Sequence, residues 1–139
     1  MQIAVVDGQG GGIGKTIIEK LREKVGDEPY ILALGTNALA TSLMLKAGAN
    51  EGATGENAIR YNAPKMDLIL GSIAILAANS LCGELSPAMA QAIAESPARK
   101  LLIPLSRSGI FVMGVEKKPL PHYVDDLTAQ VRSILRGEG

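Results

Sequence analysis

A glycine-rich stretch directly behind a short apolar run constrains this chain more than any other feature. Five glycines lie within the seven residues 8–14, and the apolar run Ile3-Ala4-Val5-Val6 precedes them. A segment with so few side chains contributes little to a hydrophobic core and loses much conformational freedom when it becomes ordered. The commonest reason for such a segment is close approach of the backbone to a ligand, so we expect a ligand to bind here.

Strands and helices are expected to alternate along the chain. The run at 2–7 is apolar on both faces, which is typical of a strand inside a parallel sheet. Hydrophobic periodicity and capping residues predict further strands at 29–34, 67–70 and 100–105, and helices at 17–25, 38–47, 57–62, 88–95 and 121–135. The stretch Gly52-Ala53-Thr54-Gly55-Glu56-Asn57 reads as a second glycine-containing turn.

The alternation predicts an α/β fold, a three-layer Rossmann-like open sheet that is mostly parallel and has about five strands. The fifth expected strand is 110–115, and only residues 106–109 separate it from the strand at 100–105. A parallel crossover needs about a dozen residues, so we expect this last strand to be antiparallel or displaced. With 139 residues, we expect a single Rossmann-like domain over 1–139.

The composition argues against several classes of function. Lys plus Arg and Asp plus Glu number 14 each, and aromatic residues make up 3%, so we expect no binding to nucleic acid or to a membrane surface. The chain has one cysteine, Cys82, and one histidine, His122, so we expect no metal site of the Cys/His type. The N-terminus reads directly into a strand without a secretory signal, which predicts a cytoplasmic protein.

Polar turns are expected at the carboxyl ends of several strands, where open α/β sheets bind their ligands. These turns are the glycine loop, Gly35-Thr36-Asn37, Gly71-Ser72 and Ser106-Arg107-Ser108. Together with the second glycine-containing turn they supply the candidate ligand-binding residues, which are Asp7, Gly8, Gln9, Gly10, Gly11, Gly12, Ile13, Gly14, Lys15, Gly35, Thr36, Asn37, Thr54, Glu56, Asn57, Ser72 and Arg107.

Two loop chemistries compete for the glycine stretch. The spacing Gly8-x-x-x-Gly12-x-Gly14 matches the loop with which short-chain dehydrogenases bind a dinucleotide pyrophosphate at a helix N-terminus. The stretch also resembles a deviant phosphate loop of ParA-type ATPases, in which Lys15 and Thr16 would contact phosphate and magnesium. We favour the first interpretation because the loop lacks the leading glycine of a standard phosphate loop, and we leave magnesium open.

The end of the second expected strand bears on the cofactor. It carries Gly35-Thr36-Asn37 in place of the acidic residue that binds a ribose hydroxyl of NAD. NADP, a mononucleotide and another phosphate ester are therefore candidate ligands as well as NAD. The pair Tyr61 and Lys65 has the spacing of the dehydrogenase catalytic residues, but Pro64 breaks the helix between them, so we read it as a surface pair.

Two charged residues have alternative roles. Asp7 either holds a ligand hydroxyl or a magnesium ion, or accepts backbone N–H groups of the glycine loop. Arg107, between two serines after a strand, either clamps phosphate or carboxylate or is a solvated turn residue.

Four motifs together resemble a small bacterial family catalogued only as a domain of unknown function. They are Asp7-Gly8-Gln9-Gly10-Gly11-Gly12-Ile13-Gly14, Leu34-Gly35-Thr36-Asn37-Ala38-Leu39-Ala40-Thr41, Gly52-Ala53-Thr54-Gly55-Glu56-Asn57-Ala58 and Leu102-Ile103-Pro104-Leu105. The resemblance covers nearly the whole chain and implies a Rossmann-like α/β domain. It carries over no activity, substrate or catalytic residue.

From the residues we expect a binding or sensor module for a nucleotide, a dinucleotide such as NAD(P), or a related phosphorylated small molecule. The alternative is a small enzyme, including an NAD(P)-dependent oxidoreductase or a ParA-like ATPase, in which Asp7 or Glu56 is the acid or base and Lys15 and Arg107 hold anionic groups. A third and weaker hypothesis is a homodimer that forms through an apolar surface at 73–81.

Overall fold

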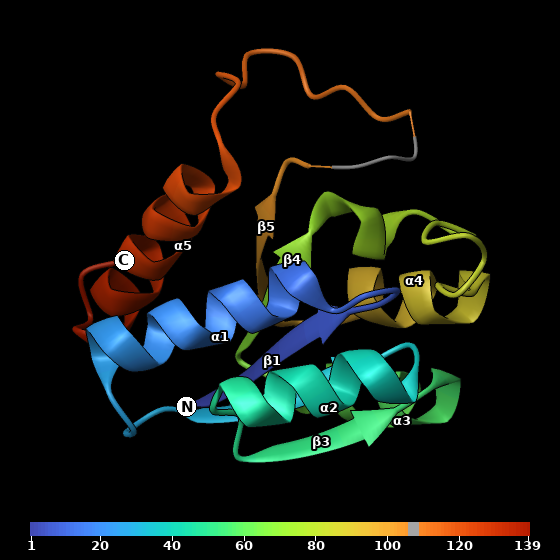
Figure 1. The fold of residues 1–139 in the computed structure, drawn as a ribbon, viewed down its shortest axis with the longest axis horizontal. Coiled ribbons are helices and arrows are strands. Elements are labelled where there is room, and N and C mark those ends of the chain that lie inside the picture. Colours follow the sequence, from blue (N-terminus) through green and yellow to red (C-terminus); the bar gives the residue numbers. More distant parts are fainter. Residues whose placement is uncertain (106–108) are drawn as a thin grey trace.

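A five-stranded, all-parallel sheet forms the centre of the structure, a computed structural model that describes residues 1–105 and 109–139 (Figure 1). The strands lie in the order β3-β2-β1-β4-β5. Their bounds are β1 (Gln2–Asp7), β2 (Tyr30–Gly35), β3 (Glu51–Thr54), β4 (Leu68–Ser72) and β5 (Arg99–Ile103). The chain therefore runs outward from β1 to β3 and then returns to the opposite side of β1, which puts the topological switch point between β1 and β4.

Helices cover both faces of the sheet, so the predicted three-layer Rossmann-like α/β fold is confirmed. One layer holds α1 (Gly12–Val25), α2 (Ala38–Ala47) and α5 (Leu120–Leu135), and the other holds α3 (Glu56–Asn62) and α4 (Pro87–Glu95). Two short 3-10 helices, η1 (Ala63–Lys65) and η2 (Ile73–Leu76), flank β4. In the described part of the chain, no helix has the length and apolar character needed to cross a membrane.

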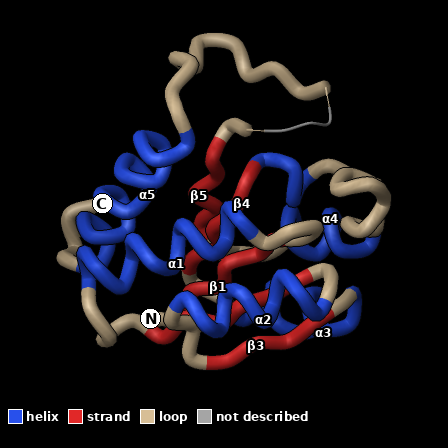
Figure 2. Tube along the Cα trace, in the orientation of Figure 1, coloured by secondary structure: helices blue, strands red, loops and turns tan. Residues whose placement is uncertain are grey.

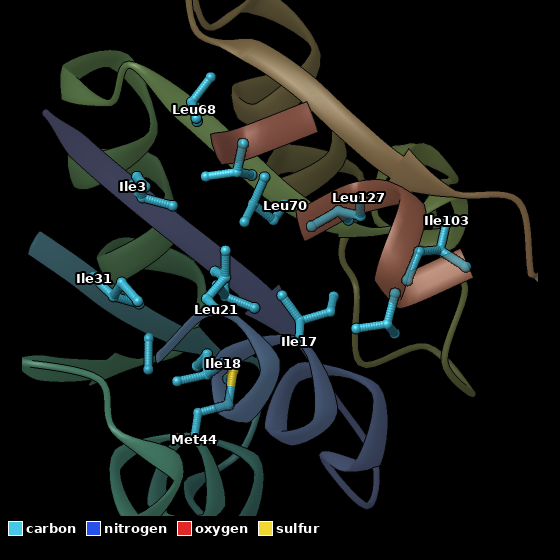
Figure 3. Packing of buried hydrophobic residues seen from close by; sticks show 14 of the residues in the cluster. Ile3, Ile17, Ile18, Leu21, Ile31, Met44, Leu68, Leu70, Ile103 and Leu127 are labelled. Atoms are coloured by element: carbon cyan, nitrogen blue, oxygen red, sulfur yellow. The ribbon is translucent and has the colours of Figure 1, made fainter. Parts of the chain in front are cut away.

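Two apolar clusters hold the layers together, one on each face of the sheet. The residues of β1 alternate between them, with Ile3 and Val5 on the α1 face and Ala4 and Val6 on the α4 face. All four are buried because a parallel strand covered on both sides exposes neither face. Figure 3 shows the first cluster, in which strand residues meet side chains from three helices, among them Ile17, Ile18, Leu21, Met44 and Leu127.

The expected antiparallel last strand is wrong. Residues 110–115 belong to an irregular loop that leads to α5 (Figure 2). Gly114 within this run has φ 83°, which interrupts an extended conformation. The outer edge of its expected partner also lacks one donor. The Arg99 amide donates to the Asp67 carbonyl beside β4, so the backbone of Lys100, Leu102 and Pro104 faces the free edge of the sheet. Pro104 has no N–H to pair there.

The fifth strand is instead β3, in a stretch that the sequence pattern assigned to a glycine-containing turn. It pairs with β2 in parallel, with Leu32 opposite Glu51 and Gly35 opposite Thr54. Only Ala53 of its four residues is partly buried, and the others are exposed. A strand so short and polar has no hydrophobic pattern by which the sequence could reveal it. It forms because its backbone hydrogen-bonds to β2 at the edge of the sheet.

The loop at 110–115 gives a direct test of this correction. Phe111 and Met113 are 82% and 81% exposed. Replacing both with serine should change the free energy of unfolding by less than about 0.5 kcal/mol in urea denaturation, because no packing is lost. The control Leu70→Ala, at a fully buried position of β4, should cost about 2–5 kcal/mol. A double serine variant destabilised as much as the control would show that the run packs in the core.

Candidate ligand-binding cavity

A cavity of about 1130 Å³ lies at the switch point, outside the carboxyl ends of β1 and β4. We call it the β1–β4 cavity. It lies where open α/β sheets bind ligands. Its described wall comes from the end of β1 and the start of α1 with the loop between them, from the end of β4 and the segment after it, from Leu105 after β5 and from Leu120 at the start of α5. The residues are Asp7, Gly8, Gln9, Gly10, Gly11, Gly12, Ile13, Ser72, Ala74, Ala78, Asn79, Ser80, Leu81, Cys82, Leu105 and Leu120.

The glycine loop presents backbone donors at this wall. Gly11 is the N-cap of α1 with φ 73°, a left-handed conformation that glycine adopts without strain. Its amide donates to the Gly8 carbonyl at 2.9 Å. Among the described residues, the amides of Gly10, Gly12 and Ile13 have no acceptor. Amides at the positive end of a helix dipole suit an anionic group.

The Asp7 carboxylate accepts hydrogen bonds from backbone amides of the same loop and of the first turn of α1. Its Oδ1 accepts the Gly8 amide at 2.8 Å and its Oδ2 accepts the Gly14 amide at 2.6 Å. Burial raises the pKa of this carboxyl above its ordinary value, against the Gly14 and Gly8 amides, which lower it. Of the two roles that the sequence left open for Asp7, these contacts are those of the second, in which it accepts backbone N–H groups.

Glu84, which the sequence analysis did not single out, organises the other side of the loop. Its Oε1 accepts the Gln9 amide at 2.7 Å, the Thr36 hydroxyl at 2.7 Å and the Asn37 Nδ2 at 2.9 Å. The Gln9 amide is the largest cause of the lowered pKa of this carboxyl, followed by the Thr36 hydroxyl. One feature of the sequence points indirectly to such a residue. Thr36 and Asn37 follow a buried strand, and no acidic residue stands beside them where a Rossmann-type site usually has one.

The turn Gly35-Thr36-Asn37 is engaged in structural contacts. The Asn37 Oδ1 caps α2 by accepting the Ala40 amide at 2.9 Å, and its Nδ2 also donates to the Gln9 carbonyl at 3.0 Å. Gly35 packs closely against Thr41 of α2. These three residues are absent from the described wall of the β1–β4 cavity, so the turn supports the glycine loop from behind.

The remaining predicted site residues lie apart from the described cavity wall. Thr54 shares a hydrogen bond with the Thr41 hydroxyl at 2.7 Å, and Glu56 accepts the Ser86 hydroxyl at 2.6 Å. Asn57 and Lys15 are exposed, in the first turns of α3 and α1. The predicted anion-binding role of Arg107, with its neighbours Ser106 and Ser108, lies outside the described residues. Of the predicted site residues that the structure describes, only those of the glycine loop and Ser72 are therefore brought together at the cavity.

Ser72 ends β4. The parallel register pairs Val5 with Leu70, and Asp7 and Ser72, each two residues further along its strand, both line the cavity. Ser72 is only 7% exposed. Its Oγ accepts the Ala74 amide at 3.3 Å, and its hydroxyl donates to no acceptor among the described residues. A buried donor without an acceptor in the wall of a cavity is suited to bind a ligand oxygen.

Backbone strain is concentrated in the wall of this cavity. In the described part of the chain, the four non-glycine residues with positive φ are Gln9 (48°), Asn79 (66°), Leu81 (57°) and Cys82 (55°), and all four line it. The segment that holds three of them is fixed by its own contacts, including the Asn79 amide, which donates to the Leu85 carbonyl at 2.7 Å. Such conformations persist where the surrounding structure enforces them, and they cluster at ligand sites.

Comparisons with known proteins identify a family but name no ligand. The family model described as "Domain of unknown function (DUF3842)" matches residues 2–136. No curated protein and no solved structure matches the chain.

Proposed function

We propose that this chain, which belongs to the DUF3842 family of domains of unknown function, binds a nucleotide or a related phosphorylated small molecule in the β1–β4 cavity. The observation that carries the proposal is the set of donors in the cavity wall. The amides of Gly10, Gly12 and Ile13 and the hydroxyl of Ser72 have no acceptor among the described residues. A phosphate at the N-terminus of α1 would accept hydrogen bonds from these groups.

Binding without turnover is the form of this function that the contacts favour. Asp7 and Glu56, the residues considered as acid or base, both accept structural hydrogen bonds, Asp7 from Gly8 and Gly14 and Glu56 from Ser86. Glu56 is also absent from the described cavity wall. We therefore propose a binding or sensor module, with no cofactor required for a reaction. Magnesium would enter only with a ligand that brings it.

A thermal-shift panel tests the proposal. It should contain inorganic phosphate, AMP, ATP, GTP, NAD, NADP, coenzyme A and sugar phosphates, each with and without magnesium. A ligand present at 100 times its Kd adds about 2.7 kcal/mol to the free energy of unfolding, which is a readily measured shift. If no member of the panel shifts the melting temperature, the proposal is wrong. If a bound ligand is chemically converted during incubation, the enzyme alternative replaces the binding module.

Gly12→Val should remove any such shift and leave the fold intact. Gly12 is exposed in the cavity wall, and a Cβ at this position meets no atom within 4 Å. The larger side chain would therefore occupy ligand space without straining the protein. Circular dichroism of the variant checks the fold, and titration with the best ligand of the panel checks binding. Unchanged affinity in a folded variant would mean that the glycine loop does not touch the ligand.

A further inference from the structure

The β2 side of the crevice is closed by protein. In Rossmann-type sites a dinucleotide extends across the switch point, and an acidic residue after the second strand binds its ribose. Here the Glu84 carboxylate stands at the end of β2, but the three hydrogen bonds that described residues donate to it, from Gln9, Thr36 and Asn37, join protein segments to each other. No residue of β2 or α2 belongs to the described wall of the β1–β4 cavity.

Close packing at Gly8 shows how little space separates these segments. A Cβ on Gly8 would overlap the Thr36 hydroxyl and would lie 2.8 Å from Leu81 Cδ1 and 3.0 Å from Glu84 Oε1. The glycine loop, the turn after β2 and the segment around Leu81 are therefore in direct contact. A ribose and base on the β2 side would have to displace Glu84.

On the β4 side, no described residue closes the cavity, and the wall has a different character. Apolar side chains form much of the described wall there, from Ile13, Ala74, Ala78, Leu81, Leu105 and Leu120. The described wall includes no lysine or arginine, and Asp7 is its one carboxylate. Backbone amides and the Ser72 hydroxyl suffice for a single phosphate, whereas a chain of phosphates is normally neutralised by cationic side chains or a metal ion.

From this asymmetry we infer that the cavity takes a compact phosphomonoester whose apolar part lies over β4, and that Glu84 is the residue that excludes dinucleotides. The inference rests on the proposed function and narrows its ligand class. Glu84 acts by position, because its carboxylate holds the turn after β2 against the glycine loop.

Amide chemical shifts in two-dimensional NMR spectra test this inference with the intact chain. Phenyl phosphate, a phosphomonoester with an apolar body, should shift the amides of Gly10, Gly12, Ile13 and Ser72 and leave those of Thr36 and Asn37 in place. NAD should bind at least 10-fold more weakly. In Gly12→Val the shifts caused by phenyl phosphate should disappear.

The possible outcomes separate the two proposals. If NAD binds as tightly as phenyl phosphate and shifts the Thr36 and Asn37 amides, the inference fails and the proposed function stands. If no compound of the thermal-shift panel and neither NMR probe perturbs the glycine loop, the proposed function fails and the inference with it.

Substitution of Glu84 gives an independent test of the inference. Glu84→Ala should raise the affinity for NAD relative to that for phenyl phosphate at least 10-fold, and NAD should now shift the Thr36 and Asn37 amides. Equal changes for both compounds would assign Glu84 a purely structural role and overturn the inference. If this variant does not fold, the measurements on the natural chain decide.

Discussion

Gly14→Val should lower the free energy of unfolding by roughly 3 kcal/mol, the sum expected from overpacking and from a lost charge-assisted hydrogen bond. Gly14 is buried in the first turn of α1, and a Cβ there would lie 2.6 Å from Met44 Sδ and 3.0 Å from the Asp7 Oδ2. A valine would push α1 away from α2 and break the 2.6 Å hydrogen bond from the Gly14 amide to Asp7. Urea denaturation measures the loss.

Gly12→Ala is the matched control for this prediction. It lies two residues earlier in the same helix, where a Cβ meets nothing within 4 Å. Its effect on the free energy of unfolding should stay within about 0.5 kcal/mol. Equal stability of the two variants would mean that α1 does not pack on Asp7 and Met44 as described.

Glu84→Ala should cost about 2–3 kcal/mol of stability, because hydrogen bonds to a charged acceptor contribute more than neutral ones. The variant would leave the Gln9 amide, the Thr36 hydroxyl and one Asn37 amide hydrogen without this acceptor. If Glu84→Ala accelerates hydrogen exchange more at the Gln9 and Thr36 amides than at the Leu70 amide, the lost stability is located at the glycine loop. Uniform acceleration over the whole sheet would contradict a local role.

The same residue predicts a pH dependence. The hydrogen bonds hold the pKa of the Glu84 carboxyl below its ordinary value of 4.5. A carboxyl whose pKa is lowered by folding contributes stability above its ordinary pKa and loses it as the pH falls toward the folded value. The stability difference between the natural chain and Glu84→Gln should therefore be largest near neutrality and shrink below pH 4.5. A difference that grew in acid would have the wrong sign.

Most of the fold could be predicted from periodicity and capping alone. The helix expected at 38–47 is α2 at Ala38–Ala47, with Asn37 as its cap. The Ser86 cap and Pro87 likewise mark the start of α4. These signals are local, because a cap and an apolar stripe act within a few residues of each other.

The errors concern elements that depend on partners far along the chain. The run at 110–115 is apolar but forms no strand, whereas β3 is short and mostly polar but pairs with β2. Edge pairing is decided by which backbone groups are free, and the residue types in a segment do not report this.

The candidate site divides in the same way. Its location was determined by the sequence, because a glycine run between a buried strand and a helix places backbone amides at the sheet edge wherever the rest of the chain lies. The tertiary structure alone decided which residues surround it. Glu84 is 75 residues from Gln9, and its hydrogen bond closes one side of the glycine loop while Ser72 remains on the open side. No local pattern encodes that contact, because it forms only when β4 returns beside β1 and brings the segment after it over the end of β2.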